Sequence, residues 1–170
     1  MATKMEIKKA TTDDANILAE LCSEIQAIHT GLKPHIFRTP SHQELVDLFK
    51  ERISDPDYTA FLAFDMDEPV GYTVLHLIRK PGNVLAYERK ILEIDHIHIV
   101  EKCRRRGFCK KLFAKALEVA RSLEIKDIQL GVWAQNGRAV AAFNALGFKQ
   151  QWAIMSLENT GSLESGDSTL

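Results

Sequence analysis

Residues 91–100 read ILEIDHIHIV, and this stretch decides the fold. Its apolar side chains occupy even positions up to Ile94 and odd positions from Ile97 onward. Side chains of a strand alternate between two faces, so a change of parity indicates one extra residue near positions 95–96. Such a residue forms a β-bulge, which bends a strand and re-aims its side chains and backbone N–H groups. The stretch therefore predicts a bulged strand.

A bulge at this point places Glu93 and His98 on the same face of the strand. That polar face is typical of a functional site, and equally of the outer side of an ordinary edge strand. The strand by itself leaves both interpretations open.

A basic turn containing a glycine follows the strand. Residues 101–109 read EKCRRRGFC, and an apolar stripe with helical spacing begins just after Gly107. The first N–H groups of a helix lack intrahelical partners and lie at the positive end of the helix dipole, so this turn suits a pyrophosphate. A solvated basic turn is the alternative. The chain contains neither a Walker loop nor a Gly-x-Gly-x-x-Gly fingerprint.

The turn resembles the acetyl-CoA motif of the GNAT superfamily of acetyl-CoA-dependent N-acetyltransferases, Gln/Arg-x-x-Gly-x-Gly/Ala. Arg104 and Gly107 match it, and Cys109 stands where glycine or alanine is usual. A second motif of the family is Asn-x-x-Ala-x-x-x-Tyr-x-x-x-Gly-Phe. The chain matches it at four positions and has phenylalanine in place of the tyrosine, at Asn136, Ala139, Phe143, Gly147 and Phe148. The resemblance is specific over residues 93–148, and earlier residues match only in the order of their elements.

The resemblance implies that acetyl-CoA lies between the bulged strand and the strand ending at Trp133. The pantetheine arm would pair with the bulged strand and reach Asn136, and the turn would cradle the pyrophosphate. The implied cofactor-binding residues are Ile97, His98, Ile99, Arg104, Arg105, Arg106, Gly107, Phe108, Cys109, Lys110, Asn136 and Phe143.

The implied reaction is direct transfer of the acetyl group to a primary amine of a small molecule or protein. Such an amine is protonated at neutral pH and needs a proton acceptor. Glu93 is the first candidate, because it occupies the position of the glutamate base in histone-acetylating members. Asp95 is the second, acting directly or through water. Alternatively, both carboxylates only bind the ammonium group of the acceptor.

The acceptor cleft of the superfamily is usually built by the loop between the first two helices. The corresponding residues here are His29, His35 and Phe37. Histidines and Asp95 also suggest a metal site, but two strand histidines without a third spaced ligand do not form a typical one. No metal is therefore predicted.

The whole chain predicts one α/β domain, 1–157, with a mixed β-sheet, helices on both faces and the GNAT-like order βααβββαβαβ. A flexible tail, 158–170, follows. The predicted strands are 6–9, 58–64, 70–78, 91–100, 127–133 and 148–157. The predicted helices run from 12 to 29, from the capping box at 41–44 to 55, onward from 107, and from 136 to 145.

Composition limits the function classes. The chain has 170 residues, is 45% hydrophobic and carries a formal net charge of −1, which disfavours a dedicated nucleic-acid or membrane-surface binder. It contains no apolar leader or membrane-length run, and its three cysteines match no Cys-x-x-Cys pattern, so a reduced, cytoplasmic setting is expected. Two rival functions remain, a non-catalytic acyl-CoA sensor and a nucleic-acid-binding module using the arginines of the turn. The oligomeric state is open, and a homodimer is one option.

Overall fold

The computed structural model describes residues 5–157. A five-stranded sheet with the order β1-β2-β3-β4-β5 forms its centre. The first four strands pair antiparallel, and β5 pairs parallel to β4. The strands are β1 Met5–Lys9, β2 Tyr58–Asp65, β3 Glu68–Lys80, β4 Arg89–Ile99 and β5 Asp127–Gln129. The predicted mixed α/β fold is confirmed.

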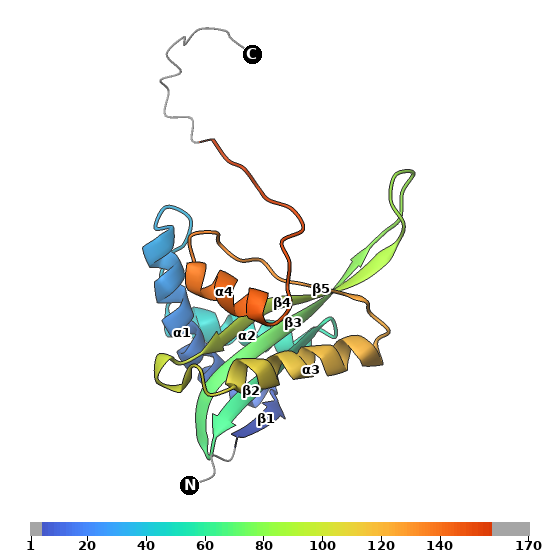
Figure 1. Ribbon diagram of the computed structural model, residues 1–170. Helices are drawn as coiled ribbons and strands as arrows, with labels where there is room; N and C mark the ends of the chain where they lie inside the picture. Colours follow the sequence, from blue (N-terminus) through green and yellow to red (C-terminus); the bar gives the residue numbers. More distant parts are fainter. Residues whose placement is uncertain (1–4, 158–170) are drawn as a thin grey trace, which may run out of the picture.

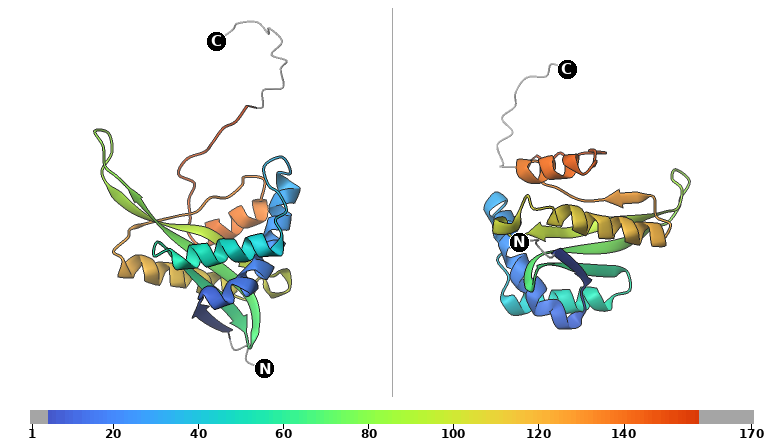
Figure 2. Two further views of the ribbon diagram at one scale, coloured as in Figure 1. Left: turned by 180° about the vertical axis from the view of Figure 1, so that it is seen from behind. Right: turned by 60° about the horizontal axis from the view of Figure 1, so that its bottom comes forward.

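Helices cover both faces of the sheet (Figures 1 and 2). The first two pack on one face around a core that includes Leu18, Phe49 and Tyr72, and α3 packs on the other with Leu75 and Leu92. The helices are α1 Ala15–Leu32, α2 His42–Ser54, α3 Phe108–Ser122 and α4 Gly137–Ala145, with 3-10 turns at Thr12–Asp14 and Glu101–Cys103.

The signals at the helix ends explain two of these boundaries. The predicted capping box before α2 is present, with Ser41 N donating to Glu44 Oε2 at 2.7 Å. α1 continues three residues beyond the predicted end, to Leu32. It stops two residues before Pro34, whose ring disfavours helical backbone at the preceding Lys33.

The predicted bulge in β4 is confirmed. Val74 of β3 pairs with His96 and the next residue, Leu75, pairs with Ile94, so Asp95 has no residue opposite it. Apolar side chains on both sides of the bulge reach the same core, that of α3, as the change in parity predicted.

Two predictions for the C-terminal part are wrong. β5 ends at Gln129 and not at Trp133, and residues 148–157 form neither helix nor strand. Beyond Phe148 the side chains of that segment are exposed, with 70% of Trp152 and 79% of Ile154 accessible to solvent. A strand-like pattern needs a neighbouring strand to pair with, and β5 offers a ladder of only three residues. The predicted tail, 158–170, lies outside the described residues.

Candidate active site

The bulge opens the sheet between β4 and the edge strand β5. β5 pairs with β4 only through Ile91, Leu92 and Glu93, the residues immediately before the bulge. Because a bulge bends its strand, β4 and the chain that follows β5 separate beyond this point. The separation forms a pocket of about 300 Å³.

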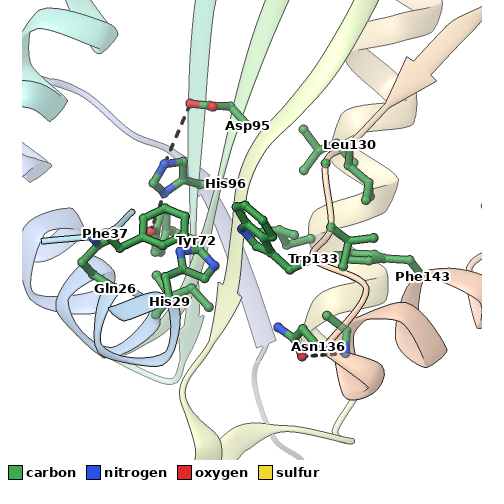
Figure 3. A pocket seen from close by; sticks show the side chains of 16 residues that line it. Gln26, His29, Phe37, Tyr72, Asp95, His96, Leu130, Trp133, Asn136 and Phe143 are labelled. Carbon is green, nitrogen blue, oxygen red and sulfur yellow. Dashed lines mark hydrogen bonds and ion pairs between the residues drawn. The ribbon is translucent and has the colours of Figure 1, made fainter. Parts of the chain in front are cut away.

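The pocket has two walls, which Figure 3 shows facing each other. One wall comes from α1, the loop after it, β3 and β4, and the other from the chain after β5 and from α4. The lining residues are Ile25, Gln26, His29, Phe37, Tyr72, Ile94, Asp95, His96, Ile97, Leu130, Gly131, Val132, Trp133, Asn136, Ala139 and Phe143.

The two predicted carboxylates lie in different surroundings. Asp95 lines the pocket, and its Oδ2 lies 2.6 Å from Nη1 of Arg52 in α2. Glu93 does not line the pocket, and its Oε2 lies 3.6 Å from Nδ1 of His76. The bulge residue is therefore the carboxylate that borders the cavity, and it is half-buried beside a guanidinium.

His96 and Tyr72 form a buried polar pair on the floor of the pocket. The Tyr72 hydroxyl and His96 Nδ1 share a hydrogen bond of 3.0 Å, while His96 Nε2 lies 4.0 Å from Oδ2 of Asp95 (Figure 3). Burial lowers the pKa of His96 from 6.5 to about 4 and raises the pKa of Tyr72 well above its ordinary value. At neutral pH both groups are uncharged.

Sequence reasoning missed the role of this pair and of Arg52. The change in parity places His96 next to the bulge, but it does not indicate a hydrogen-bonding partner for the imidazole. Arg52 lies 43 positions before Asp95 in an otherwise ordinary helix, so no sequence signal connects the two. Tyr72 lies 24 positions before His96, so no local pattern connects these two residues either.

Two of the three predicted acceptor residues line the pocket. His29 from α1 and Phe37 from the following loop are stacked with ring centroids 5.0 Å apart, and Phe37 meets Trp133 edge-on at 5.7 Å. Burial lowers the pKa of His29. His35 does not line the pocket.

The predicted pyrophosphate turn has the expected backbone. Gly107 has a φ of 89° and immediately precedes α3, whose first N–H groups point out of the helix. Positive φ is a conformation that glycine adopts without strain. Arg105 also has positive φ, at 61°, and its side chain is exposed, as is that of Lys110.

Two arginines of the turn are held by other parts of the protein. Arg104 Nε donates to the carbonyl of Ile99 at 3.0 Å, and its Nη2 lies 3.5 Å from Oε1 of Glu24. Arg106 Nη2 lies 2.7 Å from Oδ2 of Asp65. Their charges are therefore compensated within the fold.

The remaining predicted residues of the turn belong to the core. Phe108 is buried against α3's face of the sheet, so its side chain faces away from the solvent side of the turn. Cys109 is half-buried, and burial raises the pKa of its thiol.

The predicted pantetheine contacts are divided between pocket and core. Ile97 lines the pocket, whereas His98 and Ile99 do not. The His98 ring is buried, with Nε2 3.4 Å from Oε2 of Glu24. Asn136 lines the opposite wall and caps α4, its Oδ1 accepting from Ala139 N at 3.2 Å.

Phe143 lines the pocket and packs against Phe148 with ring centroids 6.0 Å apart. A tyrosine from another element could supply the hydroxyl that Phe143 lacks, and Tyr72 lines the cavity. Tyr87 lies on the loop between β3 and β4 and is 95% exposed, outside the pocket.

No group of three or more His, Cys, Asp and Glu side chains within residues 5–157 is arranged to hold a metal ion. No helix in the same range is long and apolar enough to cross a membrane.

A family model described as "Acetyltransferase (GNAT) family" matches residues 23–148, which include both walls of the pocket and the turn before α3. The chain belongs to the GNAT acetyltransferase family. This member of the family differs from the family's motifs at Cys109 in the first motif and at Phe143 in the second.

Solved structures share this GNAT fold. A tetramutant of the BH1408 protein from Bacillus halodurans is 24% identical, with a TM-score of 0.85 over 90% of this chain and 99% of that one. The aminoglycoside N-acetyltransferase AAC(6')-Iy in complex with CoA is 13% identical, with a TM-score of 0.76 over 94% and 97%. A predicted acetyltransferase from Clostridium acetobutylicum with acetyl-CoA is 17% identical, with a TM-score of 0.69 over 94% and 99%.

Proposed function

We propose that this GNAT protein transfers the acetyl group of acetyl-CoA to a primary amine by direct attack on the thioester. The observation that carries the proposal is the two-walled pocket at the end of the β4–β5 ladder. Ile97 on one wall and Asn136 on the other are available to the pantetheine arm, and the aromatic side chains near α1 are left for the acceptor. A direct transfer needs both substrates in one cavity, which this arrangement allows.

The residues fit acetyl-CoA, which when bound supplies an activated acetyl thioester. The N–H groups at the start of α3 are available for a pyrophosphate, with Arg105 and Lys110 exposed beside them. A Cβ placed on Gly107 would meet no atom within 4 Å, so the surface outside the turn is open. Arg104 and Arg106 act on the phosphates indirectly, by fixing the shape of the turn through Glu24 and Asp65.

Asp95 and Glu93 are proposed to accept the proton of the amine. Asp95 borders the cavity directly, so it can hydrogen-bond an ammonium group there. Glu93 lies two positions earlier, outside the lining, and would act through water. Neutral His96, 4.0 Å from Asp95, offers a second acceptor for the same proton.

The departing thiolate receives no proton from position 143, because Phe143 carries none. A thiol has an ordinary pKa of about 8.5, so its thiolate is a tolerable leaving group. Tyr72 supplies a hydroxyl in the pocket, but that hydroxyl is hydrogen-bonded to His96. Transfer without a protein acid at position 143 is therefore part of the proposal.

An acyl-CoA sensor is the second candidate, and Phe143 in place of the usual tyrosine favours it. A nucleic-acid-binding module is disfavoured, since Glu24 and Asp65 compensate Arg104 and Arg106. Three free cysteines agree with the proposed cytoplasmic location. A homodimer stays part of the proposal.

Two measurements test the function. Release of free thiol from acetyl-CoA should depend on an added primary amine, and tight CoA binding without transfer to any amine of a broad panel would indicate the sensor.

Calorimetry with CoA should show a large loss of affinity in Gly107→Val. Gly147→Val is the matched control, because Gly147 has a similar φ of 95° and equally open surroundings at the end of α4. Equal CoA affinity in the two variants would contradict the proposed pyrophosphate turn.

A further inference from the structure

The lining of the pocket carries no uncompensated negative charge. Among the described residues that line it, Asp95 is the single carboxylate, and Arg52 lies 2.6 Å from its Oδ2. Both side chains are about three-quarters buried, at 24% and 21% exposed, so solvent screens this pair only in part. One carboxylate matched by one guanidinium leaves the wall close to neutral.

The other titratable groups of the lining do not make it negative. Burial lowers the pKa of His29 and His96, which keeps both imidazoles neutral at pH 7. Burial also keeps the Tyr72 hydroxyl protonated. The ammonium group of Lys33 lies 5.8 Å from the Trp133 ring centroid, so the charge beside this lining residue is positive.

Aromatic rings extend from one wall of the pocket to the other. His29 and Phe37 are stacked with an interplanar angle of 30°, and Phe37 meets Trp133 at 83°. These rings come from α1, the loop after it and the chain after β5, and Figure 3 shows them on facing sides of the cavity. Aromatic pairs prefer offset-stacked or edge-on arrangements, so a flat ring of a ligand can contact these side chains in the same ways.

We infer that the acceptor is a monoamine with an aromatic or flat apolar body, held by Phe37, His29 and Trp133 with its amino group toward Asp95. The inference rests on the proposed transferase function and narrows its substrate class. It excludes polycations such as polyamines and aminoglycosides as preferred acceptors.

The exclusion follows from the cost of burying charge. A polycation brings several ammonium groups, and each one taken from water needs a carboxylate or several acceptors in its place. The lining offers one carboxylate that already has a cationic partner, and Lys33 beside Trp133 repels further cations. The aminoglycoside N-acetyltransferase AAC(6')-Iy shares the fold at 13% identity, which leaves acceptor choice to the side chains of each pocket.

The first experiment compares acceptors with the wild-type protein at saturating acetyl-CoA and about 0.15 M salt. The probes are 2-phenylethylamine, hexylamine, spermidine and kanamycin, followed by thiol release. We expect kcat/KM for 2-phenylethylamine to exceed the values for spermidine and kanamycin at least tenfold, with hexylamine between. Equal or higher values for either polycation would overturn the inference while leaving the transferase function in place.

The second experiment tests the aromatic contacts. Phe37→Ala should raise KM for 2-phenylethylamine roughly five- to tenfold, the size expected for losing an aromatic contact, and leave KM for acetyl-CoA unchanged. Ile36→Ala is the matched control, because Ile36 is the neighbouring loop residue, is 54% exposed and does not line the pocket. An unchanged KM in Phe37→Ala, or an equal rise in the control, would overturn the inference.

A binding measurement keeps the inference testable when turnover is slow. Calorimetry on the CoA-saturated protein should detect 2-phenylethylamine and give at least tenfold weaker binding for spermidine. Tighter binding of spermidine, or no binding of 2-phenylethylamine, would contradict the inference. Absence of CoA binding in the same instrument would instead contradict the proposed function itself, so the two failures are distinguishable.

Discussion

β4 has two neighbours in the sheet, and they respond differently to its bulge. The ladder with β3 shifts register at Asp95 and continues from Gly71 to Lys80. The ladder with β5 stops after three pairs, and the pocket begins where it stops. The same extra residue is thus absorbed on one side and opens a cavity on the other. The continuous side fixes the position of the strand, and the interrupted side makes its residues accessible to ligands.

The largest effect on turnover should come from replacing the two carboxylates near the end of the β4–β5 ladder, Asp95 and Glu93. Asp95→Asn should lower turnover with a good acceptor by about 10²-fold or more, within the range of 10²–10⁴ typical for loss of a general base. Glu93→Gln should lose less, because Glu93 is outside the pocket lining. Steady-state rates as a function of pH test this. Wild-type rates near neutrality in both variants would mean that solvent deprotonates the amine.

Substitutions at two glycines should affect the free energy of unfolding differently on the two sides of β4. A Cβ on Gly71 would overlap the side chain of Ile99 and the carbonyl oxygen of His98, whereas a Cβ on Gly131 would meet nothing within 4 Å. Gly71→Ala should lower the free energy of unfolding by about 2–3 kcal/mol. Gly131→Ala should change it by less than about 0.5 kcal/mol. Urea denaturation measures both, and equal losses would remove the distinction between the two sides.

Stability should depend on pH through His96, next to the bulge. Its folded pKa of about 4 lies below the unfolded value of 6.5, so between these limits the unfolded chain binds a proton that the folded chain does not. The free energy of unfolding should therefore fall as the pH drops from 6.5 toward 4.

His96→Gln should remove roughly 2 kcal/mol of this dependence between pH 7 and pH 4.5. Denaturation of both proteins at the two pH values isolates the contribution from those of other histidines. A difference between wild type and variant that does not change with pH would argue against a buried neutral imidazole.

The smallest effect is expected on the far wall of the pocket. Phe143→Tyr should be active and no slower than wild type, and the wild-type pH–rate profile should lack an alkaline limb from a tyrosine at this position. A large rate loss in Tyr72→Phe, with a CoA-bound structure showing the Tyr72 hydroxyl within hydrogen-bond reach of the sulfur, would refute transfer without a protein acid.

The comparison also explains which features were predictable from the sequence. The bulge was, because the apolar positions around Asp95 must reach one core, and the change in parity records this requirement directly. The capping box before α2 was predictable for a similar reason, since its partners are three residues apart. Membership of the GNAT family rested on the turn at Gly107 and the motif from Asn136 to Phe148.

The features that were missed depend on distant parts of the chain. Alternation in residues 148–157 reports a suitable surface for a strand, not the presence of a partner, and the three-residue β5 provides almost none. The Arg52–Asp95 pair joins α2 to β4, and the Tyr72–His96 pair joins β3 to β4. No local pattern records such contacts, so the charge and polarity of the pocket became visible only in the structure.

The bulge makes the pocket depend on one codon, that of Asp95, which the core of the protein does not need. Deleting Asp95 would join Ile94 to His96 in unbroken alternation. All remaining side chains of β4 would then keep their face of the sheet and their core contacts. Without the bend at the bulge, β4 would no longer separate from the chain after β5, and the cavity would close. A three-nucleotide deletion would in this way produce a chain with an intact core and no pocket. Selection that acts only on folding would not remove such a variant.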